Sequence, residues 1–230
     1  MKDTVLVVDD EKEICDLIAV YLKNEGYRVL KFYKGAEALE CLDCETVDLA
    51  ILDIMLPDID GYSLLRKIRE KHLFPIIMLT AKCEDIDKIN GLTLGADDYM
   101  TKPFNSLEVV TRVKTQLRRY KKYNLPGLNS DDEINIMGLT ISKKSHQCFL
   151  NSEKLNLTPR EFDILYYLCE RKGQVVSNDE LFKTVWNEKY FEAGNNTIMS
   201  HIARIREKMH ETARKPKYIK TVWGVGYKID

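Results

Sequence analysis

The sequence predicts an α/β domain with a five-stranded, parallel, doubly wound sheet, followed by a smaller α+β domain. Two observations lead to this expectation. Over the first 120 residues, short apolar runs alternate five times with segments whose apolar residues have helical spacing. Strict alternation of strand and helix places the strands in parallel, with helices on both faces of the sheet. Beyond residue 133, short strands, three helices and a final hairpin predict the α+β domain.

Five mostly apolar segments predict the strands of the first domain, because strands buried on both faces have continuous apolar runs. They are residues 4–8, 28–33, 48–52, 75–79 and 98–101. Helices are predicted from apolar residues three and four positions apart, and Gly26 ends the first of them. The residues that mark the five helices are Ile14, Leu17, Ile18, Tyr21 and Leu22; Ala36, Leu39 and Leu42; Leu64, Leu65 and Ile68; Ile86, Ile89 and Leu92; and Leu107, Val110, Val113 and Leu117.

The second domain begins after a stretch without periodicity. We expect residues 1–120 to form the first domain, 121–133 a linker rich in turn formers, and 134–230 the second domain. The predicted strands of the second domain are residues 134–141, 147–150 and 155–157. Its helices are predicted by two capping boxes, Thr158 with Glu161 and Ser177 with Glu180, and by a third helix starting near Asn196. Gly224 and Gly226 predict a hairpin over residues 218–229, so the arrangement is that of a winged helix-turn-helix.

Composition and charge exclude several classes of protein. The chain of 230 residues is 44% apolar and 31% charged, which is enough for a packed core. It has no run of about 18 apolar residues and no signal-like N-terminus, so we expect no membrane partner and a cytoplasmic location. Residues 1–120 carry 17 Lys and Arg against 22 Asp and Glu, whereas residues 121–230 carry 18 against 14. The acidic half suggests metal or charge chemistry, and the basic half suggests a polyanionic partner.

The six cysteines are dispersed, so a disulfide scaffold is not expected. Cys41 and Cys44 have the spacing of half a redox or zinc motif, but no second Cys or His pair stands at zinc spacing. We therefore expect reduced thiols, as in the cytosol.

Polar residues gather where the predicted strands end. Asp9 and Asp10 follow the first strand and Asp53 follows the third; Thr80 and Lys102 follow the fourth and fifth. The carboxyl ends of parallel strands meet at one edge of the sheet, where α/β proteins bind their ligands. Converging carboxylates raise each other's pKa, a cost that Mg²⁺ removes. The cluster predicts a Mg²⁺ site in which an Asp accepts a phosphoryl group while Lys and a hydroxyl hold its oxygens. Taken singly, these residues are also explained as helix caps, a strand end and a surface charge.

The segment from Asn195 to Met209 predicts an amphipathic helix. Its apolar stripe consists of Ile198, Ile202, Ile205 and Met209. A polar face roughly a third of a turn away contains Thr197, Ser200, His201, Arg204 and Lys208. Such a face suits the major groove of DNA, where hydroxyls contact phosphates and an Arg reads guanine. A surface helix without a DNA ligand explains the apolar stripe equally well.

The motifs at the strand ends carry a family resemblance. Residues 7–11, 52–57, Gly61, 80–81 and 102–104 resemble the flavodoxin-like, CheY-like receiver domain of two-component response regulators. The resemblance implies that a sensor histidine kinase phosphorylates Asp53 and that Thr80 and Lys102 contact the phosphoryl oxygens. It also implies that Tyr99 acts as a switch together with Thr80. The implied Mg²⁺ ligands are Asp9, Asp10, Asp53 and the backbone carbonyl of Met55.

Residues 95–99 and 117–119 resemble one group of these regulators, the OmpR/PhoB family. The resemblance implies that phosphorylated receivers form a symmetric homodimer through the helix near 86–92, the strand 98–101 and the helix near 107–117. The implied ion pairs across the two-fold axis are Lys88 with Glu108, Asp98 with Arg112, and Asp97 with Arg119. Solvated helix charges that form no interface would look the same in the sequence.

Residues 134–230 resemble the winged-helix effector domain of the same family, through residues 157–162, Trp186 and residues 221–227. The implied DNA contacts are Thr197, Ser200, His201, Arg204, Lys208, Thr221 and Trp223. Several relatives have Arg where this chain has Trp223, which leaves open whether this residue reads DNA or packs. Segments including residues 91–99 and 216–228 further resemble the VanR-type regulators of glycopeptide-resistance operons.

The resemblance implies a DNA-binding transcription regulator and not an enzyme, apart from slow autodephosphorylation. Its implied partners are the kinase, promoter DNA with tandem half-sites, and RNA polymerase. The genes that it is expected to control are those of glycopeptide resistance or the cell wall. Two alternatives stay open. A phosphatase of the haloacid dehalogenase type needs Asp-x-Asp after its first strand, where this chain has adjacent Asp9 and Asp10. A DNA-binding protein could also work with its receiver unphosphorylated.

Overall fold

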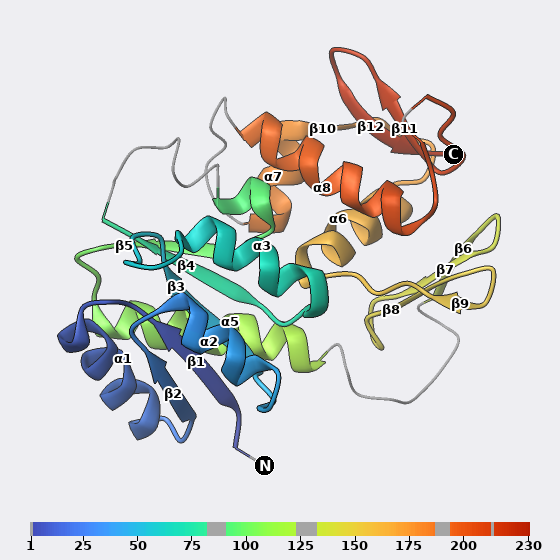
Figure 1. Ribbon diagram of the computed structural model, residues 1–230. Coiled ribbons are helices and arrows are strands. Elements are labelled where there is room, and N and C mark those ends of the chain that lie inside the picture. The colour runs from blue at the N-terminus through green and yellow to red at the C-terminus, as the bar shows by residue number, and fades with distance from the viewer. Residues whose placement is uncertain (1, 82–90, 123–132, 187–193, 213) are drawn as a thin grey trace. The chain divides into compact units, whose positions relative to one another are not determined.

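The computed structural model describes residues 2–81, 91–122, 133–186, 194–212 and 214–230. The chain divides into two compact units, Met1–Arg119 and Tyr120–Asp230. Each unit has its own sheets and helices (Figure 1), and each is described by itself below.

The first unit contains the predicted parallel sheet. Its strands are β1 (Thr4–Val8), β2 (Arg28–Phe32), β3 (Leu49–Asp53), β4 (Ile76–Thr80) and β5 (Asp98–Thr101), in the order β2-β1-β3-β4-β5. All four pairings are parallel. Strands β1, β3 and β4 are buried along their whole length, as expected for strands that helices cover on both faces.

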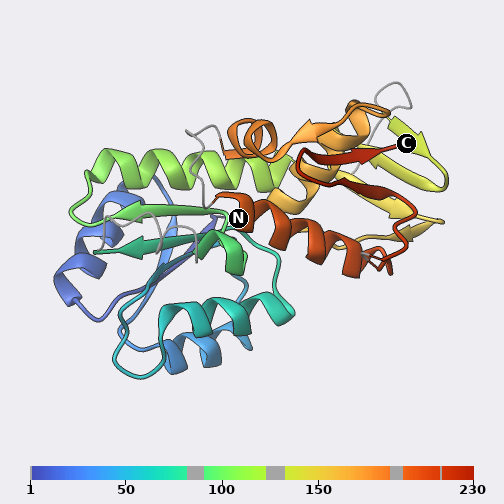
Figure 2. The same ribbon diagram turned by 90° about the horizontal axis from the view of Figure 1, so that it is seen from above.

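The described helices of this unit are α1 (Lys12–Asn24), α2 (Gly35–Leu42), α3 (Gly61–Lys71) and α5 (Ser106–Lys122). Figure 2 shows α5 on one side of the sheet and α2 and α3 on the other. Buried side chains of α1 and α5 share one core with β1, β3 and β4. Gly26, at φ +88°, ends α1 as predicted. Of the helix expected near 86–92, residues 91–94 are helical and the part before residue 91 lies outside the described residues.

The second unit starts with an antiparallel sheet, β6 (Glu133–Ile136), β7 (Leu139–Ser142), β8 (Gln147–Leu150) and β9 (Glu153–Lys154), in that order. The single strand predicted over 134–141 is therefore wrong. It is two strands joined by Met137 and Gly138, both at positive φ, the backbone that a tight hairpin turn requires. The strand predicted at 155–157 is also wrong, because a second tight turn at Asn151 and Ser152 places β9 just before it.

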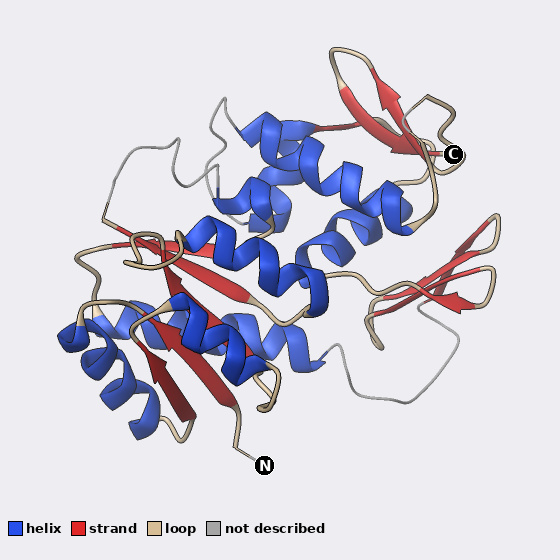
Figure 3. Cartoon of the chain, in the orientation of Figure 1, coloured by secondary structure: helices blue, strands red, loops and turns tan. Residues whose placement is uncertain are grey.

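Three helices follow, α6 (Pro159–Glu170), α7 (Asn178–Trp186) and α8 (Gly194–Lys208). The predicted capping box starts α6: the Thr158 N–H donates to the Glu161 carboxylate at 2.8 Å, and the Glu161 N–H donates to the Thr158 hydroxyl. The predicted terminal hairpin is β11 (Ile219–Val222) and β12 (Gly226–Ile229), and β10 (Val176–Ser177) pairs with β12. Figure 3 shows this hairpin beside the helices, an arrangement compatible with a winged helix.

Candidate functional site

The carboxylates predicted to converge do so at the edge of the first sheet. Asp9 and Asp10 follow β1, and Asp53 is the last residue of β3, the strand next to it. One oxygen of each lies within 4.8 Å of the others. Asp9 and Asp53 are buried, whereas Asp10 is exposed. The cluster therefore has a buried floor and one side open to solvent.

Lys102 inserts its ammonium group into this cluster. Its Nζ lies 2.7 Å from Asp9 Oδ2, and 3.1 Å from both Asp53 Oδ2 and Glu11 Oε1. Thr80 is buried at the end of β4, and its carbonyl accepts the Lys102 N–H at 2.7 Å. Four of the five predicted strand-end residues thus share one buried corner with Asp10 at its rim. Glu11, which the sequence analysis did not assign to the site, is a further partner of the lysine.

Burial sets the charge balance of the cluster. It raises the pKa of Asp9 to about 6 and also raises the pKa of Asp53. Burial by itself lowers the pKa of Lys102, but the hydrogen bond to Asp9 and the charges of Asp53 and Asp9 raise it above its ordinary value. Lys102 thus contacts three carboxylates, those of Asp9, Asp53 and Glu11, and Asp10 adds a fourth to the cluster. This excess of hard oxygen donors fits a divalent cation such as Mg²⁺.

The loop after β3 is held in place at both ends. Gly61 approaches β3 so closely that a Cβ there would lie 2.1 Å from the Asp53 carbonyl oxygen. Its N–H donates to the Ile54 carbonyl. The Asp58 carboxylate accepts both the Gly35 and Ala36 N–H groups, each at 2.9 Å, at the start of α2. Within this loop, the N–H of Met55 donates to the Asp53 carboxylate, so the Met55 backbone lies beside the cluster.

Tyr99 lies in β5, opposite Met78 of β4, and is buried. Its neighbours in the predicted dimer face are engaged within the protomer. Arg112 contacts Asp98 at 2.8 Å and Glu108 at 2.9 Å. Arg119 is half-buried on α5, and Lys88 lies outside the described residues.

Asp97, which was predicted to lie in the dimer face, is buried and paired within its own protomer. Its side chain is 1% exposed, and its carboxylate accepts from Arg69 at 2.6 Å and from the Ile76 N–H at 2.9 Å. The pair expected between Asp97 and Arg119 has no accessible acceptor in this conformation. The acid ties α3 to the sheet of its own protomer instead.

The residues of α8 that were predicted to contact DNA differ in exposure. The apolar stripe is buried as expected, but Thr197 and His201 are buried too, and His201 packs against Trp186. Lys208 binds the buried Glu161 carboxylate at 2.6 Å. Ser200 and Arg204 are half-buried. Among the residues of this helix whose burial the structure describes, 196–208, the exposed ones are Asn196, Met199, Ala203 and Glu207.

The hairpin places its two predicted DNA contacts differently. Thr221 is half-buried, and its hydroxyl accepts from Arg206 at 2.9 Å. Trp223 is 90% exposed, so it does not pack against its own domain. Arg206, which the sequence analysis missed, also donates to the Ile219 carbonyl at 2.6 Å and so links α8 to the hairpin.

Comparisons with known proteins agree with this geometry. The sequence matches the family models described as response regulator receiver domain, over residues 5–114, and as transcriptional regulatory protein, C terminal, over residues 152–229. A chain with these two parts, and with an acidic cluster at the receiver sheet edge, is a DNA-binding response regulator of a two-component system. Such a regulator works with a histidine kinase and with DNA.

Full-length relatives define the group more closely. The chain is 56% identical over 230 residues to regulatory protein VanR of Enterococcus faecium, and 58% identical over 231 residues to regulatory protein VanRc of Enterococcus gallinarum, with 100% of each chain covered. It is 42% identical to the alkaline phosphatase synthesis transcriptional regulatory protein PhoP of Bacillus subtilis, covering 100% of this chain and 98% of PhoP. This chain belongs to the OmpR/PhoB family of two-component response regulators.

Solved structures support the same assignment. The response regulator DrrB, an OmpR/PhoB homolog of Thermotoga maritima, is 33% identical with a TM-score of 0.51, covering 100% of this chain and 99% of that one. A mutant of RitR is 25% identical with a TM-score of 0.69, covering 99% of both chains. Within the described part of the chain, no helix has the length and apolar character to cross a membrane.

Proposed function

We propose that this chain controls transcription through a phosphoryl group carried by Asp53. The observation that supports this most is the buried Asp53 carboxylate, 3.1 Å from Lys102 Nζ at the open edge of the sheet. An Asp53 oxygen would attack the phosphorus of a kinase phosphohistidine, forming a P–O bond as the P–N bond breaks. Lys102 is already in place to offset the charge of the transferred group, and the Thr80 hydroxyl would donate to one of its oxygens.

The donor set proposed for Mg²⁺ is Asp9, Asp10, Asp53 and the backbone carbonyl of Met55. When bound, the ion offsets the repulsion among the carboxylates and the incoming phosphoryl group. The raised pKa of Asp9 supports a cation site, because an ionised buried acid without enough counter-charge is unfavourable. Slow hydrolysis of the acyl phosphate by water would reset the site, the only catalytic activity that we propose.

Phosphorylation would act by biasing the receiver between two conformations. Thr80 would move toward the phosphoryl group and Tyr99 would follow, because β4 and β5 are adjacent strands. The favoured state would form a homodimer through the face that carries Asp98, Glu108 and Arg112. Two effector domains held together then bind two adjacent half-sites, since linkage raises their local concentration.

The proposed setting is the cytoplasm, with a sensor histidine kinase upstream and promoter DNA and RNA polymerase as later partners. The half-sites would be tandem repeats. The full-length similarity to two VanR proteins supports control of glycopeptide-resistance or cell-wall genes. Within α8, we propose DNA contacts from Ser200 and Arg204, which the structure leaves partly exposed.

The acceptor assignment is tested by mass spectrometry of the intact protein after incubation with acetyl phosphate and Mg²⁺. Wild type is expected to gain one phosphoryl group and Asp53→Ala none. Asp43→Ala, which removes an exposed carboxylate paired with Lys71, is the control and should be phosphorylated normally. A phosphoryl gain in Asp53→Ala would show that the acceptor is another residue.

Footprinting of the DNA upstream of this reading frame distinguishes DNA binding that depends on phosphorylation from the alternative, a receiver that works unphosphorylated. Phosphodonor should increase protection by wild type and leave Asp53→Ala unchanged. Equal affinity of both proteins with and without phosphodonor would favour a receiver that works unphosphorylated.

A further inference from the structure

Glu11 contacts the lysine of the phosphoryl site from the solvent side. Its Oε1 atom lies 3.1 Å from Lys102 Nζ. The side chains of the other two acidic partners, Asp9 and Asp53, are 0% and 4% exposed, whereas that of Glu11 is 59% exposed. Water screens an exposed ion pair much more than a buried one. Of the three ion pairs of the lysine, the one with Glu11 is therefore the easiest to break.

The backbone of Glu11 is fixed, but the helix does not hold its side chain. The Glu11 N–H donates to Asp9 Oδ1 at 3.0 Å, and its carbonyl accepts the N–H groups of Ile14 and Cys15, both at 3.1 Å. Glu11 is the N-cap residue of α1, where a side chain ordinarily accepts from the first helical N–H groups. The Glu11 side chain makes no such bond and pairs with Lys102 instead. Its release therefore requires rotation of one exposed side chain and no movement of the backbone.

The lysine has as many acidic partners as it has donors. An ammonium group carries three N–H bonds, and three carboxylates lie within 3.1 Å of Lys102 Nζ. A phosphoryl group on Asp53 adds about two negative charges and further acceptor oxygens beside the lysine. To bind one of these oxygens, Lys102 has to give up a partner. The same added charge repels the carboxylate of Glu11, the partner that water can accept.

We propose that Glu11 is a positioning residue that holds Lys102 in the unphosphorylated receiver and is displaced from it by the phosphoryl group. The inference rests on the proposed phosphorylation of Asp53 and deepens it. Before transfer, the contact restrains the ammonium group at the open side of the site. After transfer, it competes with the phosphoryl oxygens for the same donor. Loss of the contact therefore favours the phosphorylated form.

The role of a metal ligand suits Glu11 less well. Among the residues that the structure describes, the carboxylates placed to hold one ion together are those of Asp9, Asp10 and Asp53, whose oxygens lie within 4.8 Å of one another. Glu11 is not part of this group, although it is the next residue in the chain. Its carboxylate is placed with the lysine, and the affinity for Mg²⁺ alone distinguishes the two roles.

The experiment titrates the full-length protein, saturated with Mg²⁺, with beryllofluoride, a stable analogue of the phosphoryl group. Glu11→Gln keeps the shape of the side chain and removes its charge. Glu11→Asp keeps the charge but is one methylene shorter, so its carboxylate is withdrawn from the lysine. Both variants are expected to bind the analogue about two- to fivefold more tightly than wild type, the change that corresponds to one exposed ion pair. Glu13→Gln removes an exposed acid of the first turn of α1 and should bind like wild type.

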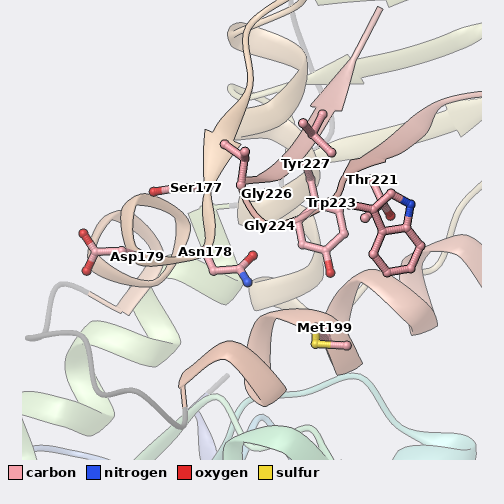
Figure 4. Close-up of a pocket in the computed structure, with 11 residues that line it drawn as sticks. Ser177, Asn178, Asp179, Met199, Thr221, Trp223, Gly224, Gly226 and Tyr227 are labelled. Carbon is pink, nitrogen blue, oxygen red and sulfur yellow. The ribbon is translucent and has the colours of Figure 1, made fainter.

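Calorimetry suits this titration better than tryptophan fluorescence, because both tryptophans belong to the second unit. Figure 4 shows Trp223 on the hairpin and Met199 on α8 across from it. Calorimetric titration with Mg²⁺ alone gives a second readout. Glu11→Asp, which keeps the net charge, should bind Mg²⁺ like wild type.

Several results would overturn the role of Glu11. Unchanged or weaker binding of beryllofluoride by either Glu11 variant would show that the contact does not compete with the phosphoryl group. Equal tightening by Glu13→Gln would assign the effect to net charge and not to the contact. Loss of Mg²⁺ affinity by about tenfold in Glu11→Asp would make Glu11 a partner of the metal. Failure of wild type to bind beryllofluoride or to gain a phosphoryl group would instead contradict the proposed phosphorylation itself.

Discussion

His146 shows at the scale of one residue how burial controls charge. It lies in the turn between β7 and β8, its side chain is 3% exposed, and its ring meets Phe162 edge-on. Burial lowers its pKa to about 3, although Asp163 Oδ1 lies 3.9 Å from Nε2. The folded domain therefore holds this imidazole neutral well below the pH at which an unfolded histidine protonates.

Acid should destabilise the second unit through this residue. An unfolded histidine protonates near 6.5 and folded His146 only near 3. The contribution of neutral His146 to the free energy of unfolding is therefore present above about pH 6.5 and falls as the pH drops toward 3. Roughly 2 kcal/mol is lost by pH 5. Urea unfolding followed by tryptophan fluorescence measures this, since both tryptophans lie in the second unit.

His146→Asn should flatten this pH dependence relative to wild type. His210→Asn is a matched control, because His210 also has a positive φ but is exposed. The interpretation fails if both variants retain the pH dependence of wild type.

At the scale of elements, the loop between β3 and α3 determines the shape of the acidic site. Asp58 binds two N–H groups of α2, Asp60 caps α3 by accepting from the Ser63 N–H, and Gly61 allows close approach to β3. The Met55 backbone belongs to this loop. The position of a proposed Mg²⁺ ligand therefore depends on a contact with a helix that contributes no ligand.

Asp58→Ala is accordingly expected to weaken Mg²⁺ binding by about tenfold, as loss of an outer-shell contact typically does. It should also lower stability by about 1 kcal/mol, because two N–H groups at a helix start lose their acceptor. Calorimetric titration with Mg²⁺ measures the affinity directly, and Asp43→Ala again serves as the exposed-carboxylate control. If the variant is less stable but binds Mg²⁺ normally, Asp58 acts only as a helix cap and does not position the Mg²⁺ ligand.

At the scale of the whole molecule, phosphorylation of the first unit has to change how the second unit binds DNA. The structure gives each unit its own sheets, so we assign the coupling to dimerisation of the receiver. In the described protomer Arg112 binds Asp98 and Glu108 of the same chain. A dimer face built from these residues would exchange pairs within a protomer for pairs between protomers.

Charge reversal tests this exchange. Asp98→Lys and Arg112→Glu should each abolish the dimer formed with a phosphoryl analogue, because each homodimer would oppose like charges. A mixture of the two variants should form a heterodimer, since one native pair and one reversed pair then meet across the two-fold axis. Sedimentation velocity distinguishes these states, and intact mass after acetyl phosphate shows that the receivers still fold. Dimers formed by either variant alone would place the interface elsewhere.

The sequence could predict the sheet and the acidic corner because both follow from strand periodicity. Asp9, Asp53, Thr80 and Lys102 converge wherever parallel strands end together. The sequence could not predict which face of α8 is exposed to solvent. Helical spacing shows which residues share a face, but it does not show how many faces other helices cover. Packing against α6 and α7 buries two faces of that helix, including Thr197 and His201.

Other features left no readable signal in the sequence. Met137 at φ +48° breaks a predicted strand, although methionine rarely adopts this backbone. Asp58 and Asp97 look like ordinary surface acids, and only the fold brings the α2 N–H groups and Arg69 to them. Contacts between residues far apart in the chain therefore decided the cases that periodicity left open.

The small number of exposed residues on α8 also has an evolutionary consequence. Met199, Ala203 and Glu207 have no part in the core, so they can mutate without loss of folding, whereas their buried neighbours cannot. Duplicated copies of such a gene could acquire new target operators by drifting at these few sites. The same constraint makes these positions the natural place to randomise when redirecting the regulator to a chosen promoter.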